Sequence, residues 1–159
     1  MELAAVKPVA AGFEAELLAS YPALVRRLAL VLRDPTEAED VAQSAFARAW
    51  EARARFFGGD MRAWFFTIGL RLAFNERRRR HRAELRVLAP APVWAVVADL
   101  DLWTALADIE PRQRAALFLN VIDGYTHEEI AVMLDVRPGT VASWLSRTKE
   151  RLRVALREK

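Results

Sequence analysis

Positive charge is concentrated near the end of the chain, on one expected helix. Residues 137–153 contain a single acid, Glu150, and five cations, which are Arg137, Arg147, Lys149, Arg151 and Arg153. Cations at this density suit the phosphate backbone of DNA, and hydroxyl side chains between them can reach base edges. The chemistry that this pattern predicts is non-covalent recognition of DNA.

Two short helical patterns and a tight turn position these cations. Thr126-His127-Glu128-Glu129 is a capping box, whose first and last side chains bond backbone N–H groups at a helix start. After a turn through residues 135–139, a second helix should point Val141, Leu145 and Leu152 inward. This order is typical of a helix-turn-helix, whose second helix enters the major groove. The residues expected to meet DNA are Arg137, Thr140, Ser143, Trp144, Arg147 and Arg151.

The first half of the chain contains a helix with an acidic face. Asp34-Pro35-Thr36-Glu37 offers an N-cap acceptor, a proline at N1 and a glutamate at N3, which predicts a helix start. Apolar residues then recur at spacings of three and four as far as Trp50. They leave polar residues on other faces, including Glu37, Glu39, Asp40 and Gln43.

A second basic cluster follows the next expected helix. After the Gly58-Gly59 loop, Asp60 can cap a helix with an apolar pattern from Met61 to Leu72. Seven arginines then lie between Arg71 and Arg86. Trp64 shares the apolar spacing, so a place in the core competes with a role in stacking on bases. The preceding segment, 13–32, predicts either two short helices or one helix kinked at Pro22.

Composition limits the classes of function. The chain has 159 residues, 53% of them hydrophobic, a formal charge of +3 and no cysteine. Two isolated histidines, His81 and His127, and the absence of a glycine-rich phosphate loop predict neither an enzyme nor a metal or other cofactor. No apolar stretch approaches the roughly 18 residues of a membrane span, so we expect a soluble, cytoplasmic protein without membrane insertion.

Helical periodicity without strand alternation predicts an all-α fold. Pro90 and Pro92 interrupt the pattern, and we therefore expect two small helical domains, 1–82 and 99–159, joined by a linker at 83–98. The linker contains an unusually apolar stretch, Val93 to Val97, which is suited to docking on a domain or a partner.

Three blocks in order resemble the extracytoplasmic-function (ECF) group of sigma-70 factors, the initiation factors of bacterial RNA polymerase. Residues 34–50 are similar to sigma region 2.2, residues 61–68 with the arginine run to regions 2.3 and 2.4, and residues 108–152 to region 4. The resemblance implies a region 2 helical bundle joined to a region 4 helix-turn-helix. It also implies a specialised sigma factor that directs promoter-specific initiation.

The resemblance also implies partners and residue roles. The partners are core RNA polymerase through its β′ clamp helices and β flap, promoter DNA, and an anti-sigma factor. The polymerase-binding residues are Glu37, Glu39, Asp40 and Gln43, and the minus-10 DNA-binding residues are Arg62, Trp64, Asn75, Arg77, Arg78 and Arg79. The residues that bind the minus-35 element are the outer residues of the helix-turn-helix named above.

Several positions depart from the family pattern. Gly69-Leu70-Arg71 replaces a common Ala-Arg-Asn, and Asn75 replaces a common aspartate. Ala142 and Trp144 stand where many members have lysine and arginine. These differences favour either an altered minus-35 preference or weaker binding there. The alternatives to a sigma factor are a stand-alone helix-turn-helix regulator and a sigma-mimicking adaptor.

Overall fold

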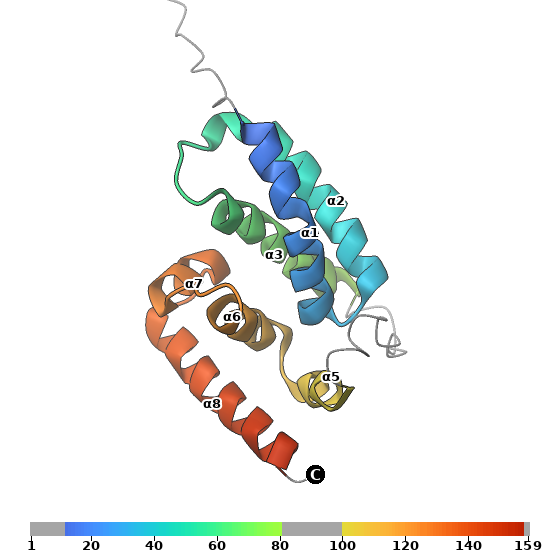
Figure 1. Cartoon of the computed structure of the whole chain (residues 1–159), viewed down its shortest axis with the longest axis vertical. Helices are drawn as coiled ribbons and strands as arrows, with labels where there is room; N and C mark the ends of the chain where they lie inside the picture. Colours follow the sequence, from blue (N-terminus) through green and yellow to red (C-terminus); the bar gives the residue numbers. More distant parts are fainter. Residues whose placement is uncertain (1–11, 81–99, 158–159) are drawn as a thin grey trace, which may run out of the picture.

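Every regular element that the computed structural model describes is helical. The described residues are 12–80 and 100–157, with the side chains of residues 76–80 and 100 left out (Figure 1). The elements are α1 (Phe13–Leu32), α2 (Pro35–Glu51), the 3-10 helix η1 (Arg53–Arg55), α3 (Met61–Arg80), α5 (Leu100–Ala105), the 3-10 helix η2 (Leu106–Asp108), α6 (Pro111–Val121), α7 (His127–Leu134) and α8 (Pro138–Arg157). The prediction of an all-α fold is confirmed. The expected linker, with Val93 to Val97, lies outside the described residues.

Helix α1 is one continuous helix with Pro22 inside it. The sequence allows either two short helices or one kinked helix in this segment, and the first of these expectations is therefore wrong. The helix ends at Arg33, which adopts left-handed backbone angles with φ of 54°. Its buried face includes Leu17, Leu24 and Leu28, and it packs on α2 and α3 to form a three-helix unit.

The expected start of α2 is confirmed. The Asp34 carboxylate accepts a hydrogen bond of 3.1 Å from the backbone N–H of Glu37, and Pro35 opens the helix. The apolar stripe of α2 is made of small residues, with Ala38, Ala42 and Ala45 fully buried. Small side chains let helix axes approach closely, so α2 lies tightly against α1 and α3.

Helix α3 is apolar on two sides. Asp60 caps it by accepting from the backbone N–H of Ala63 at 3.0 Å, as the sequence predicts. Phe65 contacts Phe46 of α2 edge to face, whereas Phe66 lies under the guanidinium of Arg62 at 5.1 Å. Both phenylalanines are fully buried, because α1 and α2 cover one side of α3 and the second half of the chain covers the other (Figure 1).

Gly69 accounts for one departure from the family pattern. A Cβ atom at this position of α3 would lie 2.8 Å from Cδ1 and 3.1 Å from Cδ2 of Leu24 on α1. Contacts shorter than van der Waals distance force neighbouring side chains off their rotamers. Glycine therefore permits the close packing of α1 on α3.

We expect Gly69→Val to lower the free energy of unfolding by about 1 to 2 kcal/mol, because a branched side chain overpacks this contact. Urea denaturation followed by circular dichroism measures the change. The matched control is Gly139→Val in α8, where a Cβ would meet no atom within 4 Å. Equal losses in the two variants would contradict the packing role of Gly69.

The second half of the chain contains the predicted helix-turn-helix, α7 and α8. The Thr126 hydroxyl accepts from the N–H of Glu129 at 3.2 Å, and the Glu129 carboxylate accepts from the N–H of Thr126 at 2.8 Å, which confirms the capping box. Val141 and Leu145 of α8 are buried and Leu152 is half-buried, all as expected. Helices α5 and α6 complete the unit beneath α8.

The two halves pack against each other, α6 on α1 and α7 on α3 (Figure 1). Arg114 of α6 is buried in this contact. Its Nε and Nη2 donate to the carbonyl oxygen of Val31 in α1 at 2.9 and 2.6 Å, and its Nη1 donates to the carbonyls of Leu106 and Ile109 at 2.9 and 2.8 Å. Val31 belongs to the last turn of α1, where carbonyls lack helical partners. Arg114 thus caps a helix of the other half.

Candidate polymerase and promoter interfaces

An exposed acidic face lies on α2. Glu39, Asp40 and Gln43 are exposed, as expected for a surface that binds a basic partner. Glu37 differs from the expectation, because the residue is buried, with only 6% of its surface exposed. It lies in the first turn of α2, on the buried side of the helix. The face therefore consists of Glu39, Asp40 and Gln43.

Aromatic side chains support this face from below. Phe46 is half-buried and stands edge to face against Tyr21 of α1, with ring centroids 6.1 Å apart. Burial raises the pKa of the Tyr21 hydroxyl, and the nearby Glu39 carboxylate raises it further. Tyr21 therefore stays neutral at physiological pH beside the acidic face. Phe46 also contacts α3, so the face is fixed to the helical bundle.

The expected minus-10 residues are divided between surface and core. Arg62 and Asn75 are exposed on α3, 13 positions apart in the sequence. Trp64 is half-buried among aromatic rings, 5.9 Å from Phe13 and 5.2 Å from Phe56 between centroids, so a place at the core is favoured. Arg77, Arg78 and Arg79 continue α3, and their side chains lie outside the described residues.

The loop between α2 and α3 adds aromatic surface that sequence reasoning missed. Phe57 is 87% exposed. Trp50 is partly exposed nearby along the chain, and the guanidinium of Arg53 lies 4.7 Å from its ring centroid. Exposed aromatic rings beside cations are suited to stack on unpaired bases. The signal in the sequence was an aromatic residue directly before a glycine pair, in a loop.

Arg62 is also engaged by the second half of the chain. Its Nη2 donates to Oδ1 of Asp123 at 3.0 Å, and the same carboxylate takes two bonds from Arg27, at 2.7 Å from Nε and 2.8 Å from Nη2. Tyr125 is buried next to them, close to the carboxylate of Asp60. Burial raises the pKa of the Tyr125 hydroxyl, and the charge of Asp60 raises it further.

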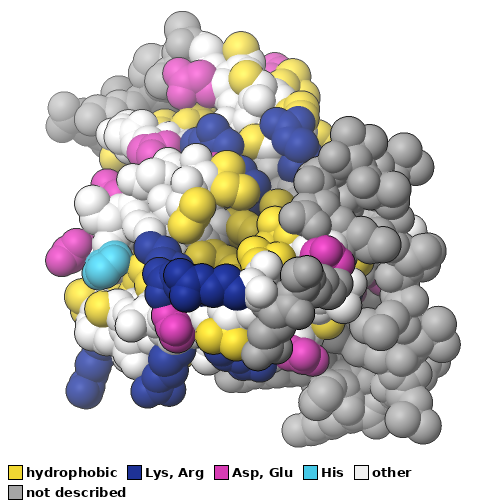
Figure 2. All heavy atoms as spheres, turned by 60° about the horizontal axis from the view of Figure 1, so that its bottom comes forward, with side chains coloured by type: hydrophobic (Ala, Val, Ile, Leu, Met, Phe, Trp, Pro, Cys, Tyr) yellow, Lys and Arg dark blue, Asp and Glu magenta, His cyan; other side chains and the backbone are white. Residues whose placement is uncertain are grey.

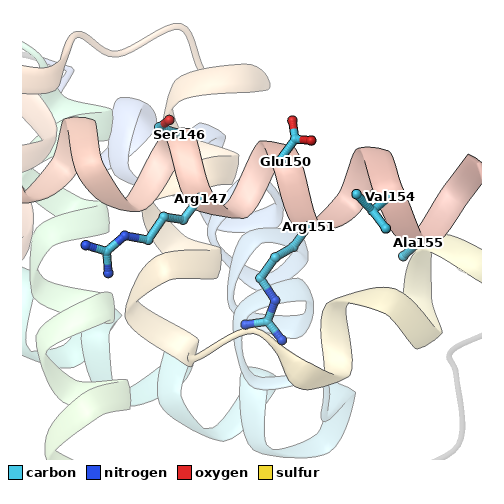
Figure 3. A pocket seen from close by; sticks show the side chains of 6 residues that line it. All are labelled: Ser146, Arg147, Glu150, Arg151, Val154 and Ala155. Carbon is cyan, nitrogen blue, oxygen red and sulfur yellow. The ribbon is translucent and has the colours of Figure 1, made fainter.

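The basic face of α8 carries the other DNA-binding candidates. Cations spread over this end of the molecule with apolar side chains between them (Figure 2). Arg147 and Arg151 point to the same side of α8, one turn apart, along an open groove with a volume of about 710 Å³ (Figure 3). Arg137 is exposed, and Thr140 and Ser143 are half-exposed. These five side chains can reach a nucleic acid together.

Trp144 differs from the expectation. The sequence predicts it on the outer side of α8 with the DNA-facing residues. It has the same intermediate exposure as Thr140 and Ser143, and its ring packs against the hydrophobic core. It follows Val141 by three positions, and residues at this spacing share a helix face. Trp144 therefore lies at the edge between the inner stripe and the outer face of α8.

Comparison with known proteins identifies the family. Residues 17–83 match the family model for sigma-70 region 2, and residues 99–152 match the model for sigma-70 region 4. The ECF RNA polymerase sigma factor SigL of Mycobacterium tuberculosis is 30% identical over 94% of this chain and 94% of its own length. The chain belongs to the ECF sigma factors. Another relative, ECF sigma factor SigE of Mycolicibacterium smegmatis, is 31% identical over 87% of this chain, which spans 59% of the SigE length.

The fold of this ECF sigma factor matches a solved relative. The sigma factor RpoE of Bartonella quintana, in complex with the anti-sigma factor NepR, superposes with a TM-score of 0.81 at 29% identity. The match covers 91% of this chain and 96% of RpoE. In these terms α1 to α3 form region 2, and α5 to α8 form region 4.

Sequence reasoning on this sigma factor also missed Arg27 and Asp123. Arg27 interrupts the apolar stripe of Leu24, Leu28 and Val31, and an arginine on a buried face is rare unless it is paired. That signal predicts a partner and does not reveal which residue supplies it. Within the described ranges, no cluster of metal-binding side chains occurs. No described helix is long and apolar enough to cross a lipid bilayer.

Proposed function

We propose that this protein is a specialised sigma factor that binds core RNA polymerase and directs promoter-specific initiation. The observation that carries the proposal is the combination, in one ECF sigma chain, of an exposed acidic face on α2 and a basic helix-turn-helix. A stand-alone regulator needs only the second. SigL and SigE are by their names RNA polymerase sigma factors. This protein likewise acts with RNA polymerase, and its site of action is the cytoplasm.

The acidic face of Glu39, Asp40 and Gln43 binds the β′ clamp helices, while region 4 contacts the β flap. Complementary charge accelerates and orients such an encounter. Three features support this role for the face: exposure, negative charge and the rigid aromatic layer beneath it. Residues 1–82 carry this function, and residues 99–159 carry minus-35 recognition.

Region 2 recognises and opens the minus-10 element. Arg62, Asn75 and the arginines 77–79 contact the DNA backbone and base edges, which positions the strand. The exposed ring of Phe57 offers a surface for an unpaired base, and stacking of this kind contributes about 1 to 3 kcal/mol per base. Base capture drives opening, so the factor itself performs no catalytic step and holds no cofactor.

Region 4 binds the minus-35 element through α8. Arg147 and Arg151 lie along the groove and neutralise phosphates, whereas Thr140 and Ser143 are placed to reach base edges. Arg137 contacts the backbone at the helix start. An anti-sigma factor is the remaining expected partner, as RpoE has in NepR.

Asp40→Arg is expected to weaken competition with the housekeeping sigma factor for core RNA polymerase by at least about tenfold, because a cation then faces the basic clamp helices. Binding of labelled protein to core enzyme, titrated with the housekeeping factor, measures the loss. Asp108→Arg is the matched control, since Asp108 is an exposed acid outside α2.

The wild-type chain separates the candidate functions in the same assay. Core binding, followed by initiation on a pool of random-sequence templates whose RNA 5′ ends are sequenced, supports the sigma factor. Core binding without transcription on any template indicates a sigma-mimicking adaptor. Failure to bind core, with specific binding of the protein alone to duplex DNA, indicates a stand-alone regulator.

A further inference from the structure

The contact between regions 2 and 4 contains one carboxylate that holds two arginines. Asp123 is in the turn between α6 and α7, and its side chain is 2% exposed. Arg27 of α1 donates two parallel bonds to it, and Arg62 of α3 donates a third. Two guanidinium groups of region 2 therefore converge on a single point, and region 4 supplies the anion there.

Two converging guanidinium groups are typical of sites that bind phosphate. The planar fork of arginine donates in pairs to the oxygens of carboxylates and phosphates alike. Both guanidinium groups come from region 2 and the carboxylate that they share comes from region 4, so separation of the halves leaves the two cations without Asp123. Asp60 of region 2 is another carboxylate close by. The carboxylate thus fills a place that a phosphate group could fill with the same donors.

The position of the pair fits a DNA strand that runs along α3. Arg62 stands at the start of α3, and its guanidinium carbon lies over the Phe66 ring, 5.1 Å from the ring centroid. Arg27 is buried beneath it, with its side chain 7% exposed while region 4 is in place. Helix α3 continues from this point toward Asn75 and the arginine run.

The contact between the halves is built so that it can separate. Arg114 retains its hydrogen bonds to the carbonyls of Leu106 and Ile109 within region 4, whereas its bonds to Val31 of α1 are lost on opening. Asp123 and Tyr125 of region 4 are buried in the contact and become solvated on opening. The capping bonds at the starts of α2, α3 and α7 each lie within one half and remain.

We propose that Arg27 and Arg62 form a binding site for a backbone phosphate of promoter DNA, and that Asp123 occupies this site in the closed chain. The proposal rests on the proposed function, because a minus-10 strand must lie along α3. Closure by Asp123 keeps this site of region 2 from binding DNA in the free factor, and separation of the two halves on the polymerase exposes the site.

The first arm of the test measures closure. The chain has no cysteine, so Ser44→Cys on α2 and Ser146→Cys on α8 introduce two exposed sites for a donor and an acceptor dye. We expect high energy transfer in the otherwise wild-type protein and clearly lower transfer after Asp123→Asn, which removes the charge and keeps the shape. Asp108→Asn makes the same change of net charge at an exposed site and should leave transfer unchanged.

The second arm measures phosphate binding with a fluorescein-labelled single-stranded oligonucleotide of mixed sequence. Fluorescence anisotropy should show that Asp123→Asn binds it about tenfold more tightly than wild type or Asp108→Asn, because charge-assisted contacts to phosphate become available. The double variants Arg27→Gln/Asp123→Asn and Arg62→Gln/Asp123→Asn should lose this gain. Inorganic phosphate serves as a competitor, and a strand displaced only at high phosphate supports a site that prefers the polymer.

Three outcomes overturn the proposal. Unchanged energy transfer in Asp123→Asn means that Asp123 does not hold the halves together. Lower energy transfer in Asp123→Asn without tighter DNA binding means that the arginines form no phosphate site. The same conclusion follows if Arg27→Gln/Asp123→Asn binds the oligonucleotide as tightly as Asp123→Asn. Circular dichroism checks that the variants fold. Should Asp123→Asn lose helicity, Tyr125→Phe weakens closure without altering the arginines and gives the same two readouts.

Failure of this proposal is separable from failure of the proposed function. Binding of the wild-type chain to core RNA polymerase and initiation from promoters do not require Asp123. A factor that transcribes normally, yet shows no gain of DNA binding in Asp123→Asn, refutes the phosphate site alone.

Discussion

Arg114→Ala is expected to lower the free energy of unfolding by about 3 kcal/mol, the largest single effect we predict. Arg114 is 3% exposed, and its guanidinium donates four hydrogen bonds to three carbonyl oxygens. Removing it leaves those carbonyls without their donor in a buried position. It also removes a cation from the C-terminal end of α1, where the helix dipole favours positive charge.

Arg112→Ala is the matched control for Arg114. Arg112 lies on the same helix, is half-exposed and rests on the ring of Phe74 at 5.3 Å, so its loss should cost less than about 1 kcal/mol. Urea denaturation followed at the helical circular dichroism band compares the two. Arg114→Lys should recover only part of the loss, because an ammonium group cannot reach three carbonyls in the plane of a guanidinium. Equal stability of the two alanine variants would falsify the capping role.

Local signals in the sequence were sufficient to predict the elements. Asp34 with Pro35, Asp60 and the Thr126–Glu129 box each act within four residues, and the structure places each one at its predicted helix start. Backbone donors at a helix start need a partner close by in the chain, so the residue types that supply it are visible in the sequence. The acidic face of α2 followed from the same periodicity, apart from Glu37.

Contacts between the two halves could not be predicted in this way. Arg27 and Asp123 are 96 positions apart in the sequence, and Arg114 and Val31 are 83 apart. Nothing in local spacing relates such residues. The second apolar side of α3, with Phe66, is covered by region 4, which the spacing within α3 does not indicate. The closed arrangement is thus a property of tertiary packing.

Trp144 shows how the spacing along α8 can be misassigned. Our prediction from the sequence places it on the outer side with Thr140, Ser143 and Arg147. The spacing of Val141, Trp144, Leu145 and Thr148 on α8 instead follows the three-and-four rule of a buried stripe, and the structure agrees with the spacing. The tryptophan at this position therefore contributes to how α8 packs on the core.

Trp144→Arg is expected to lower the free energy of unfolding by about 2 to 3 kcal/mol, because it replaces a large apolar contact by a charge beside the core. As a consequence, minus-35 binding by the holoenzyme should weaken, although the variant adds a cation to the recognition helix. Thermal denaturation and electrophoretic mobility shift with promoter DNA measure the two effects.

The matched control is Ser146→Arg, two positions further along α8 at an exposed site on the groove. It adds the same charge without touching the core, so the unfolding temperature should stay at the wild-type value and binding to DNA should tighten through one more phosphate contact. Comparison of Trp144→Arg with Ser146→Arg shows whether the side chain at position 144 faces the core or the DNA. A Trp144→Arg variant as stable as wild type, with tighter minus-35 binding, places this position on the DNA face. Loss of stability together with loss of binding assigns Trp144 to the packing that holds α8 in place for the groove.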